Sequence, residues 1–121
     1  MLNIKIKTTN FDKTPAIEDY VYKKMASLEK FLNKEGNVLC EVELGKTTGH
    51  HKSGEIFKAE LNIVESKGRQ FFIKADETDL YAAIDVMRDN AEEVIVSKKK
   101  KENSLFRRGA MRIKKLLKRN K

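Results

Sequence analysis

The apolar residues of this chain follow two different spacings, and the order of these spacings limits the possible folds. In some segments they alternate with polar residues, as in strands that bury one face; these segments span residues 2–7, 38–44, 57–63 and 71–75. In others they recur every three or four residues, as in helices with one apolar face; these span residues 14–32 and 78–95. The order β-α-β-β-β-α predicts the α+β class, with a four-stranded mixed sheet and two helices on one face.

The first helix has clear start and stop signals. Thr14 is an N-cap hydroxyl, and Pro15 occupies the first helical position, where its missing N–H costs nothing. We expect the helix to end around residues 34–37, with Gly36 as a left-handed C-cap. Because a crossover helix joins them, the first two strands should be parallel. The expected buried face comprises Ile17, Val21, Met25 or Leu28, and Leu32.

The second helix should open near Thr78, with Asp79 in its first turn to complement the helix dipole. Its expected apolar face comprises Leu80, Ile84, Met87, Ala91, Val94 and Ile95.

Charge divides the chain into two parts. The 121 residues carry a formal net charge of +8, but residues 1–97 hold 14 basic and 17 acidic side chains, a net charge of −3. Residues 98–121, the basic segment, hold 12 basic side chains and one acidic, Glu102, a net charge of +11. We therefore predict an α+β domain over 1–97 and a basic tail, helical or disordered, over 98–121. Blocks of one charge sign are typical of interaction tails, here with a polyanion as partner.

The basic segment also has apolar residues at helical spacing: Phe106, Ala110, Ile113 and Leu117. Gly109 weakens such a helix by roughly 1 kcal/mol relative to Ala, so we expect disorder or fraying until a partner orders it. Two alternatives remain, a solubilising charge run and an amphipathic helix on anionic lipid. The cations available for phosphate are Lys98, Lys99, Lys100, Lys101, Arg107, Arg108, Arg112, Lys114, Lys115, Lys118, Arg119 and Lys121.

Several classes of protein are disfavoured. The single cysteine, Cys40, has no partner for an internal disulfide and alternates with core residues, so we interpret it as a small core hydrophobe. No apolar run of membrane-spanning length exists and the N-terminus alternates, which favours a cytoplasmic protein. His50 and His51 invite a metal or general-base interpretation, but no carboxylate or thiolate has suitable spacing. We predict no enzyme activity, metal, cofactor or small-molecule substrate.

The aromatic residues do not form the exposed stacking platform of RNA-recognition strands. Phe57, Phe71 and Phe72 are expected to be core or half-core residues. Tyr81 could stack on a base, but packing against the sheet edge is the favoured interpretation.

Three motifs resemble the ribosome hibernation-promoting factor / ribosome-associated inhibitor (protein Y) family. The run Asp79-Leu80-Tyr81-Ala82-Ala83-Ile84-Asp85 is similar to the most recognisable segment of that family. Thr14-Pro15-Ala16-Ile17 and Leu28-Glu29-Lys30-Phe31 resemble its first helix, and His50-His51-Lys52-Ser53-Gly54 with Phe57-Lys58-Ala59-Glu60 resembles its central hairpin.

The resemblance implies a fold akin to double-stranded-RNA-binding domains and a protein that docks on the small (30S) ribosomal subunit. There it would bind 16S rRNA in the mRNA channel and the tRNA A- and P-site region, blocking initiation by steric occlusion without catalysis. The resemblance implies Lys23, Lys24, Lys30 and Arg88 as rRNA contacts. We expect a monomer away from the ribosome, without a membrane partner.

The second helix departs from the family pattern. Where relatives commonly have a basic stretch, this chain has Glu92 and Glu93, which would repel phosphate. We therefore expect Lys98–Lys101 and the rest of the basic segment to supply most of the phosphate contacts. The short remainder after Ser97 is expected to mark a short form without a dimerisation domain. The alternative function is a general double-stranded RNA- or nucleic-acid-binding module acting off the ribosome.

Overall fold

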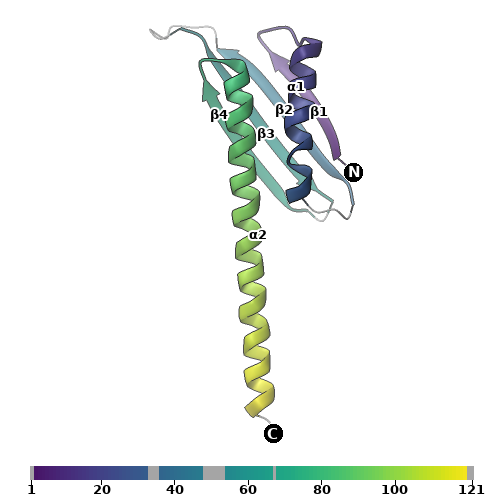
Figure 1. The fold of residues 1–121 in the computed structure, drawn as a ribbon, viewed down its shortest axis with the longest axis vertical. Coiled ribbons are helices and arrows are strands. Elements are labelled where there is room, and N and C mark those ends of the chain that lie inside the picture. The colour runs from purple at the N-terminus through teal and green to yellow at the C-terminus, as the bar shows by residue number, and fades with distance from the viewer. Residues whose placement is uncertain (1, 33–35, 48–53, 67, 120–121) are drawn as a thin grey trace.

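The structure, a computed structural model, describes residues 2–32, 36–47, 54–66 and 68–119, with the backbone alone at 106–107 and 110–119. Its elements, in chain order, are β1 (Leu2–Thr9), α1 (Pro15–Ala26), the short 3-10 helix η1 (Glu29–Phe31), β2 (Val38–Thr47), β3 (Ile56–Glu65), β4 (Gln70–Glu77) and α2 (Leu80–Arg119). The sheet has the order β1-β2-β3-β4 (Figure 1). β1 and β2 are parallel, and the other neighbours are antiparallel. The predicted α+β order and mixed sheet are confirmed.

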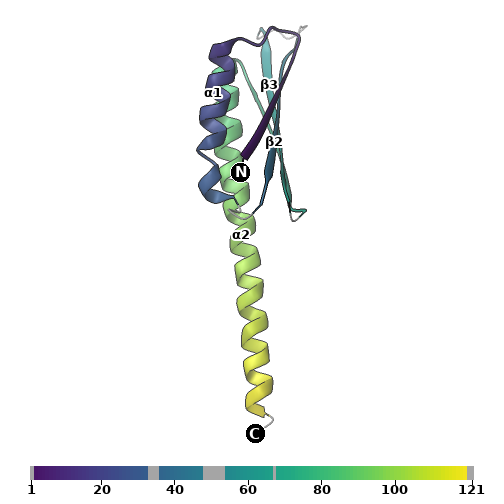
Figure 2. The same ribbon diagram turned by 90° about the vertical axis from the view of Figure 1, so that its right-hand side faces the viewer.

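Both helices cover the same face of the sheet (Figure 2). Their apolar sides pack on the inward residues of the strands, which alternate with outward polar residues as a half-buried sheet requires. Cys40 is fully buried in this core, and burial raises the pKa of its thiol to about 12. The core comprises Ile17, Val21, Met25, Leu28, Leu32, Val38, Cys40, Val42, Leu44, Ala59, Leu61, Ile63, Phe71, Ile73, Ala75, Leu80, Ala83, Ile84, Met87, Ala91 and Ile95.

The first helix starts as predicted but ends earlier. Thr14 Oγ1 accepts a hydrogen bond from the Ile17 amide at 3.2 Å, and Pro15 is the first helical residue. The α-helix ends at Ala26, because the chain tightens into 3-10 turns after it: the Leu28 amide bonds the Met25 carbonyl. This tighter turn still buries Leu28, so the apolar face is kept although the helix is shorter.

Gly36 is left-handed, with φ at +94°, but it lies in the connection to β2 and does not cap α1. A Cβ there would lie 2.3 Å from Ser66 Oγ. The next residue, Asn37, also contacts Ser66 of the β3–β4 turn, because its carbonyl accepts a hydrogen bond from the Ser66 amide. The backbone angle favours glycine here, and any larger residue would also force the Ser66 hydroxyl to move away.

The second helix begins one residue after Asp79, which caps it from outside its first turn. Asp79 Oδ2 accepts from the Ala82 amide at 3.1 Å. The predicted apolar face is buried except for Val94, which is 42% exposed because it lies at the margin of the face that Ala91 and Ile95 present to the sheet.

The basic segment is not a separate tail in the structure, since α2 runs without a break through Ser97 to Arg119 (Figure 1). This differs from the expected disorder, because lysine and arginine are good helix formers and Gly109 is a single weak position in a long helix. At 1.5 Å per residue the 40 residues of α2 span about 60 Å. The last buried core residue is Ile95, so more than half of this length projects beyond the sheet. The functional division at Ser97 stays a prediction.

Candidate nucleic-acid interface

The cations predicted to contact RNA fall into two groups. Lys23 and Lys30 are exposed on α1 and η1, and Lys100, Lys101 and Arg108 are exposed on the projecting part of α2. The others with described side chains, Lys24, Arg88, Lys98 and Lys99, are partly covered or contact other residues. The side chains of Arg107 and Arg112, and the loop with His50 and His51, lie outside the described residues.

Lys24 joins α1 to α2 through a polar cluster with Tyr20 and Asp85. Its Nζ lies 3.1 Å from Asp85 Oδ1, to which the Tyr20 hydroxyl also donates a hydrogen bond. Partial burial would raise the pKa of Asp85, but the hydrogen bonds from Tyr20 and Lys24 outweigh it and lower the pKa. The hydrogen bond to Asp85 likewise raises the pKa of Tyr20 and of Lys24. Lys24 is therefore a cation already matched by a carboxylate.

Tyr81 completes this cluster instead of packing on the sheet edge. Its ring lies 4.9 Å from the ring of Tyr20, centroid to centroid, and it remains 41% exposed. The contact is therefore between the two helices.

Arg88 is more enclosed than the sequence suggests. Its side chain is 14% exposed, and its Nε donates to Ser27 Oγ at 2.8 Å across the two helices. Its Nη1 lies 3.0 Å from Glu92 Oε1 and 3.2 Å from Asp89 Oδ1. The guanidinium is thus already bound by two carboxylates, and a phosphate would have to displace at least one of them. Glu92 does more than repel an anion, because it competes for the same cation.

The basic segment starts where α2 leaves the sheet. Lys98 Nζ approaches the Gln70 carbonyl at 3.4 Å and lies 4.9 Å from the centroid of the Phe71 ring. Beyond it Lys100, Lys101 and Arg108 face solvent, and none of them forms an ion pair within the described residues. This projecting surface therefore presents positive charge that no carboxylate of the described residues offsets, as the exposed Lys23 does on α1.

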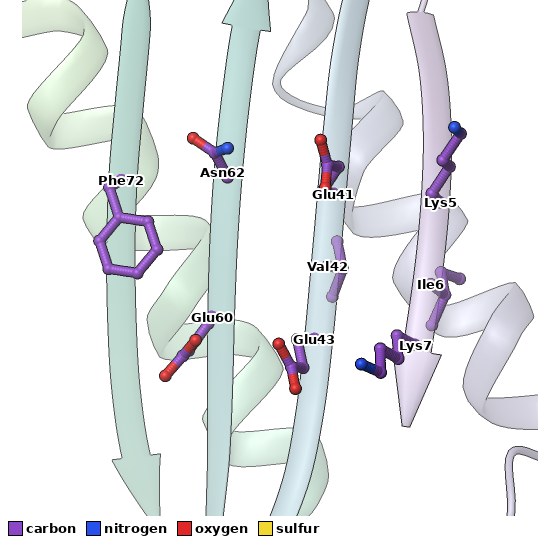
Figure 3. A pocket seen from close by; sticks show the side chains of 9 residues that line it. All are labelled: Lys5, Ile6, Lys7, Glu41, Val42, Glu43, Glu60, Asn62 and Phe72. Atoms are coloured by element: carbon purple, nitrogen blue, oxygen red, sulfur yellow. The ribbon is translucent and has the colours of Figure 1, made fainter. Parts of the chain in front are cut away.

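The face of the sheet opposite the helices has a mixed charge pattern (Figure 3). Lys7 lies beside Glu43, Glu43 beside Glu60, and Glu60 beside Lys74, across all four strands. A groove of ≈ 290 Å³ runs over this face. Its central carboxylates are poorly suited to phosphate, so the helical side is the better candidate for RNA.

The prediction that Phe72 is a core or half-core residue was wrong, because this residue lies on the open face. It is 59% exposed, because adjacent residues of a strand point to opposite sides and its neighbour Phe71 takes the core position. Phe71 and the half-buried Phe57 agree with the prediction.

In the described ranges, histidine, cysteine and acidic residues form no group of three or more that could hold a metal ion. Within the same ranges, no helix is apolar over a stretch long enough to cross a membrane.

Comparison with known proteins now places the chain in a family. Residues 4–103 match the model of the family described as Sigma 54 modulation protein / S30EA ribosomal protein. The chain belongs to this family. Ribosome hibernation promoting factor of Klebsiella oxytoca is 30% identical over 88 residues, covering 73% of this chain and 83% of the relative. The factor of the same name from Pseudomonas putida is 27% identical over 111 residues, covering 92% and 100%.

Solved structures agree with this assignment to the Sigma 54 modulation protein / S30EA family. The Protein Y N-terminal domain of Thermus thermophilus is 31% identical, with a TM-score of 0.64 over 77% of this chain and 94% of that one. A ribosomal subunit interface protein from Coxiella burnetii, 18% identical, shares the fold with a TM-score of 0.57 over 82% and 98%. The predicted family and fold are confirmed, and the chain is a member of a family of ribosome-associated factors.

Sequence reasoning missed the contacts between the β3–β4 turn and the basic segment. Arg69 Nη1 lies 3.1 Å from Glu102 Oε2, and Arg69 Nε lies 3.6 Å from Glu65 Oε1. A signal was present: Glu102 is the single acidic residue of the basic segment, and it follows Ile95 by seven residues, which places it on the same helical face.

Proposed function

We propose that this protein binds the small ribosomal subunit through 16S rRNA, in the mRNA channel and the tRNA A- and P-site region, and blocks initiation by occupying that space. Ribosomes held in this way would stay idle in the cytoplasm. The binding is steric and electrostatic, and no reaction takes place.

The observation that carries the proposal is the projecting half of α2. There α2 continues as a helix as far as Arg119, within a stretch of sequence, residues 98–121, whose net charge is +11. Such a helix can neutralise several phosphates at once and release their counterions. The compact domain beside it has a net charge of −3 over residues 1–97, so it contributes shape more than charge.

The exposed lysines of the first helical region extend the proposed interface. Lys23 and Lys30 lie on the helical side of the molecule and are exposed, so they can reach phosphate directly. Lys24 and Arg88 would contribute only when the phosphate replaces Asp85 or Glu92 as their partner. We therefore propose Lys23, Lys30, Lys100, Lys101 and Arg108 as the first contacts, with Lys24 and Arg88 as exchangeable ones.

The test is co-sedimentation of the full chain with purified small subunits in sucrose gradients at rising salt. A matched duplex RNA of the same phosphate concentration serves as the control ligand. We expect the protein to remain on small subunits at salt concentrations that release it from the duplex, because shape-specific contacts add to the electrostatic ones.

Equal release from both ligands would overturn the ribosomal proposal and favour a general double-stranded RNA-binding module. Site occupancy is tested in the same preparation: mRNA and initiator tRNA should compete with the bound protein. Simultaneous binding of all three would contradict a block of initiation.

A further inference from the structure

The β3–β4 turn holds the basic segment at its root through a chain of three charged residues. Glu65, at the end of β3, is 2% exposed on the helix-covered side of the sheet. Arg69, four residues on, lies 3.6 Å from it by Nε–Oε1 and reaches Glu102 of α2 with Nη1–Oε2 at 3.1 Å. The arginine thus lies between one carboxylate in the fold and one in the projecting helix.

The buried carboxylate explains why the arginine is there. Both oxygens of Glu65 lack a hydrogen-bond partner within the described residues, so Arg69 is the cation that offsets its charge. A buried charge without a counterion is strongly unfavourable, which ties the arginine to this position. Arg69 Nη1 lies at ion-pair distance from Glu102 Oε2 but makes no hydrogen bond within the described residues, and the more compact lysine ammonium would not span both carboxylates in this way.

Glu102 is the matching half of the contact. It is the single carboxylate of a segment with 12 basic residues, and in a surface built only to bind phosphate it would be a defect. Its position four residues after Lys98 puts both on the face of α2 that meets the β3–β4 turn. Lys98 contacts the Gln70 carbonyl and the Phe71 ring beside Arg69.

We propose that Arg69 is a positioning residue that, with Glu65 and Glu102, fixes the direction in which the basic helix leaves the sheet. The contact lies at the point where core packing of α2 ends, after Ile95, so a small change of angle there moves the far end of the helix by many ångströms. The consequence for RNA affinity rests on the proposed function. A helix whose direction is already fixed loses less conformational entropy when it binds phosphates, so it binds them more tightly.

The direct test is a distance measurement on the free protein. Spin labels go on cysteines placed at two exposed sites, Lys5→Cys on β1 and Arg108→Cys on α2. Cys40 stays unlabelled because it is buried. We expect a narrow distribution of label-to-label distances in the parent chain and a wider one after Glu102→Gln, which keeps Glu65 paired with Arg69.

Arg69→Ala should widen the distance distribution as much as Glu102→Gln does. The double variant should show no further widening, because both changes break the same Arg69–Glu102 contact. Lys74→Ala is the matched control, because it removes a β4 cation whose only ion pair in the described chain is with Glu60, at 3.9 Å. If Arg69→Ala does not fold, the same distance distribution is measured on Arg69→Lys and Glu102→Gln, and both should be wider than that of the parent chain. An unchanged distribution in Glu102→Gln would overturn the positioning role.

Affinity for small subunits gives the second readout. If charge alone mattered, Glu102→Gln would strengthen binding by removing repulsion. Positioning predicts a loss of about three- to tenfold with an unchanged salt slope, the size of a coupling between contacting residues; stronger binding would overturn the role in alignment. Failure of the parent chain to bind small subunits would instead contradict the proposed function, and the distances would still decide whether Arg69 fixes the helix.

Discussion

The two halves of α2 show how one helix can be specified by two different forces. In residues 80–95 every turn buries apolar side chains against the sheet, as Ile84 and Met87 do completely. In residues 98–119 the same helix touches the end of the sheet only near its start, through Lys98 and Glu102, among the side chains that the structure describes, and the segment carries many basic residues (Figure 1). The first half is held in place by burial of apolar side chains, which depends little on salt. The second half presents exposed charges, whose interactions are screened by salt. Substitutions in the two halves should therefore move different observables.

Removal of residues 98–121 should have the largest effect. We expect affinity for small subunits to fall by about a thousandfold at low salt, and the slope of log affinity against log salt to flatten by about 0.7–0.9 per lost phosphate contact. Measuring binding at several salt concentrations checks both. An unchanged slope would remove the basic segment from the interface.

Ile84→Ala tests the packed half. The side chain is fully buried, so its truncation should lower the free energy of unfolding by about 2–5 kcal/mol, measured by urea denaturation. The salt slope of RNA binding should not change. Leu105→Ala, at a position 65% exposed, is the control and should stay within about 0.5 kcal/mol of the parent. Similar losses in both variants would contradict the division of α2.

Glu92→Gln probes the boundary between the halves. The change removes one of the two carboxylates paired with Arg88 and leaves Asp89, so we expect several-fold tighter RNA binding and a salt slope steeper by at most about one phosphate contact. Glu93→Gln removes the same charge from an exposed residue that forms no ion pair in the described chain. Equal effects of the two would mean that Arg88 is not released and that only general repulsion is relieved.

The smallest expected effect concerns the link between α1 and α2. The pKa of Asp85 is lowered in the fold, so its ionised form stabilises the protein above the unfolded-state pKa, and this contribution is lost as pH falls through the folded-state pKa. Asp85 is 43% exposed, so the contribution is below about 1 kcal/mol. Asp85→Asn should be less stable than the parent in urea at pH 7, and this difference should shrink as the pH is lowered toward 3. A constant difference at both pH values would contradict this ionic role.

Much of the fold could be predicted from the sequence, because burial follows periodicity. The strands, their order and nearly all core residues were recognisable in this way, and Phe72 and Val94 were wrong because each lies beside a residue that takes the core position. The early end of α1 depends on 3-10 turns around Leu28 that a pattern of apolar residues does not distinguish from α-helix.

The sequence identified the cations of the candidate site but not the residues with which they pair. Arg88 is recognisable as a cation, but its partner Ser27 lies 61 residues away in sequence, and only the packing of α1 on α2 brings them together. The same holds for Arg69 and Glu102, which belong to different elements. Charge counts therefore overstate how many cations are free to bind phosphate.

The most direct measurement is a density map of the protein bound to the small ribosomal subunit. We expect the basic half of α2 to lie alongside rRNA phosphates in the mRNA channel, with the open face of the sheet, which carries Glu43 and Glu60, turned away from RNA. Density that placed this sheet face against rRNA and left residues 98–119 in solvent would contradict it.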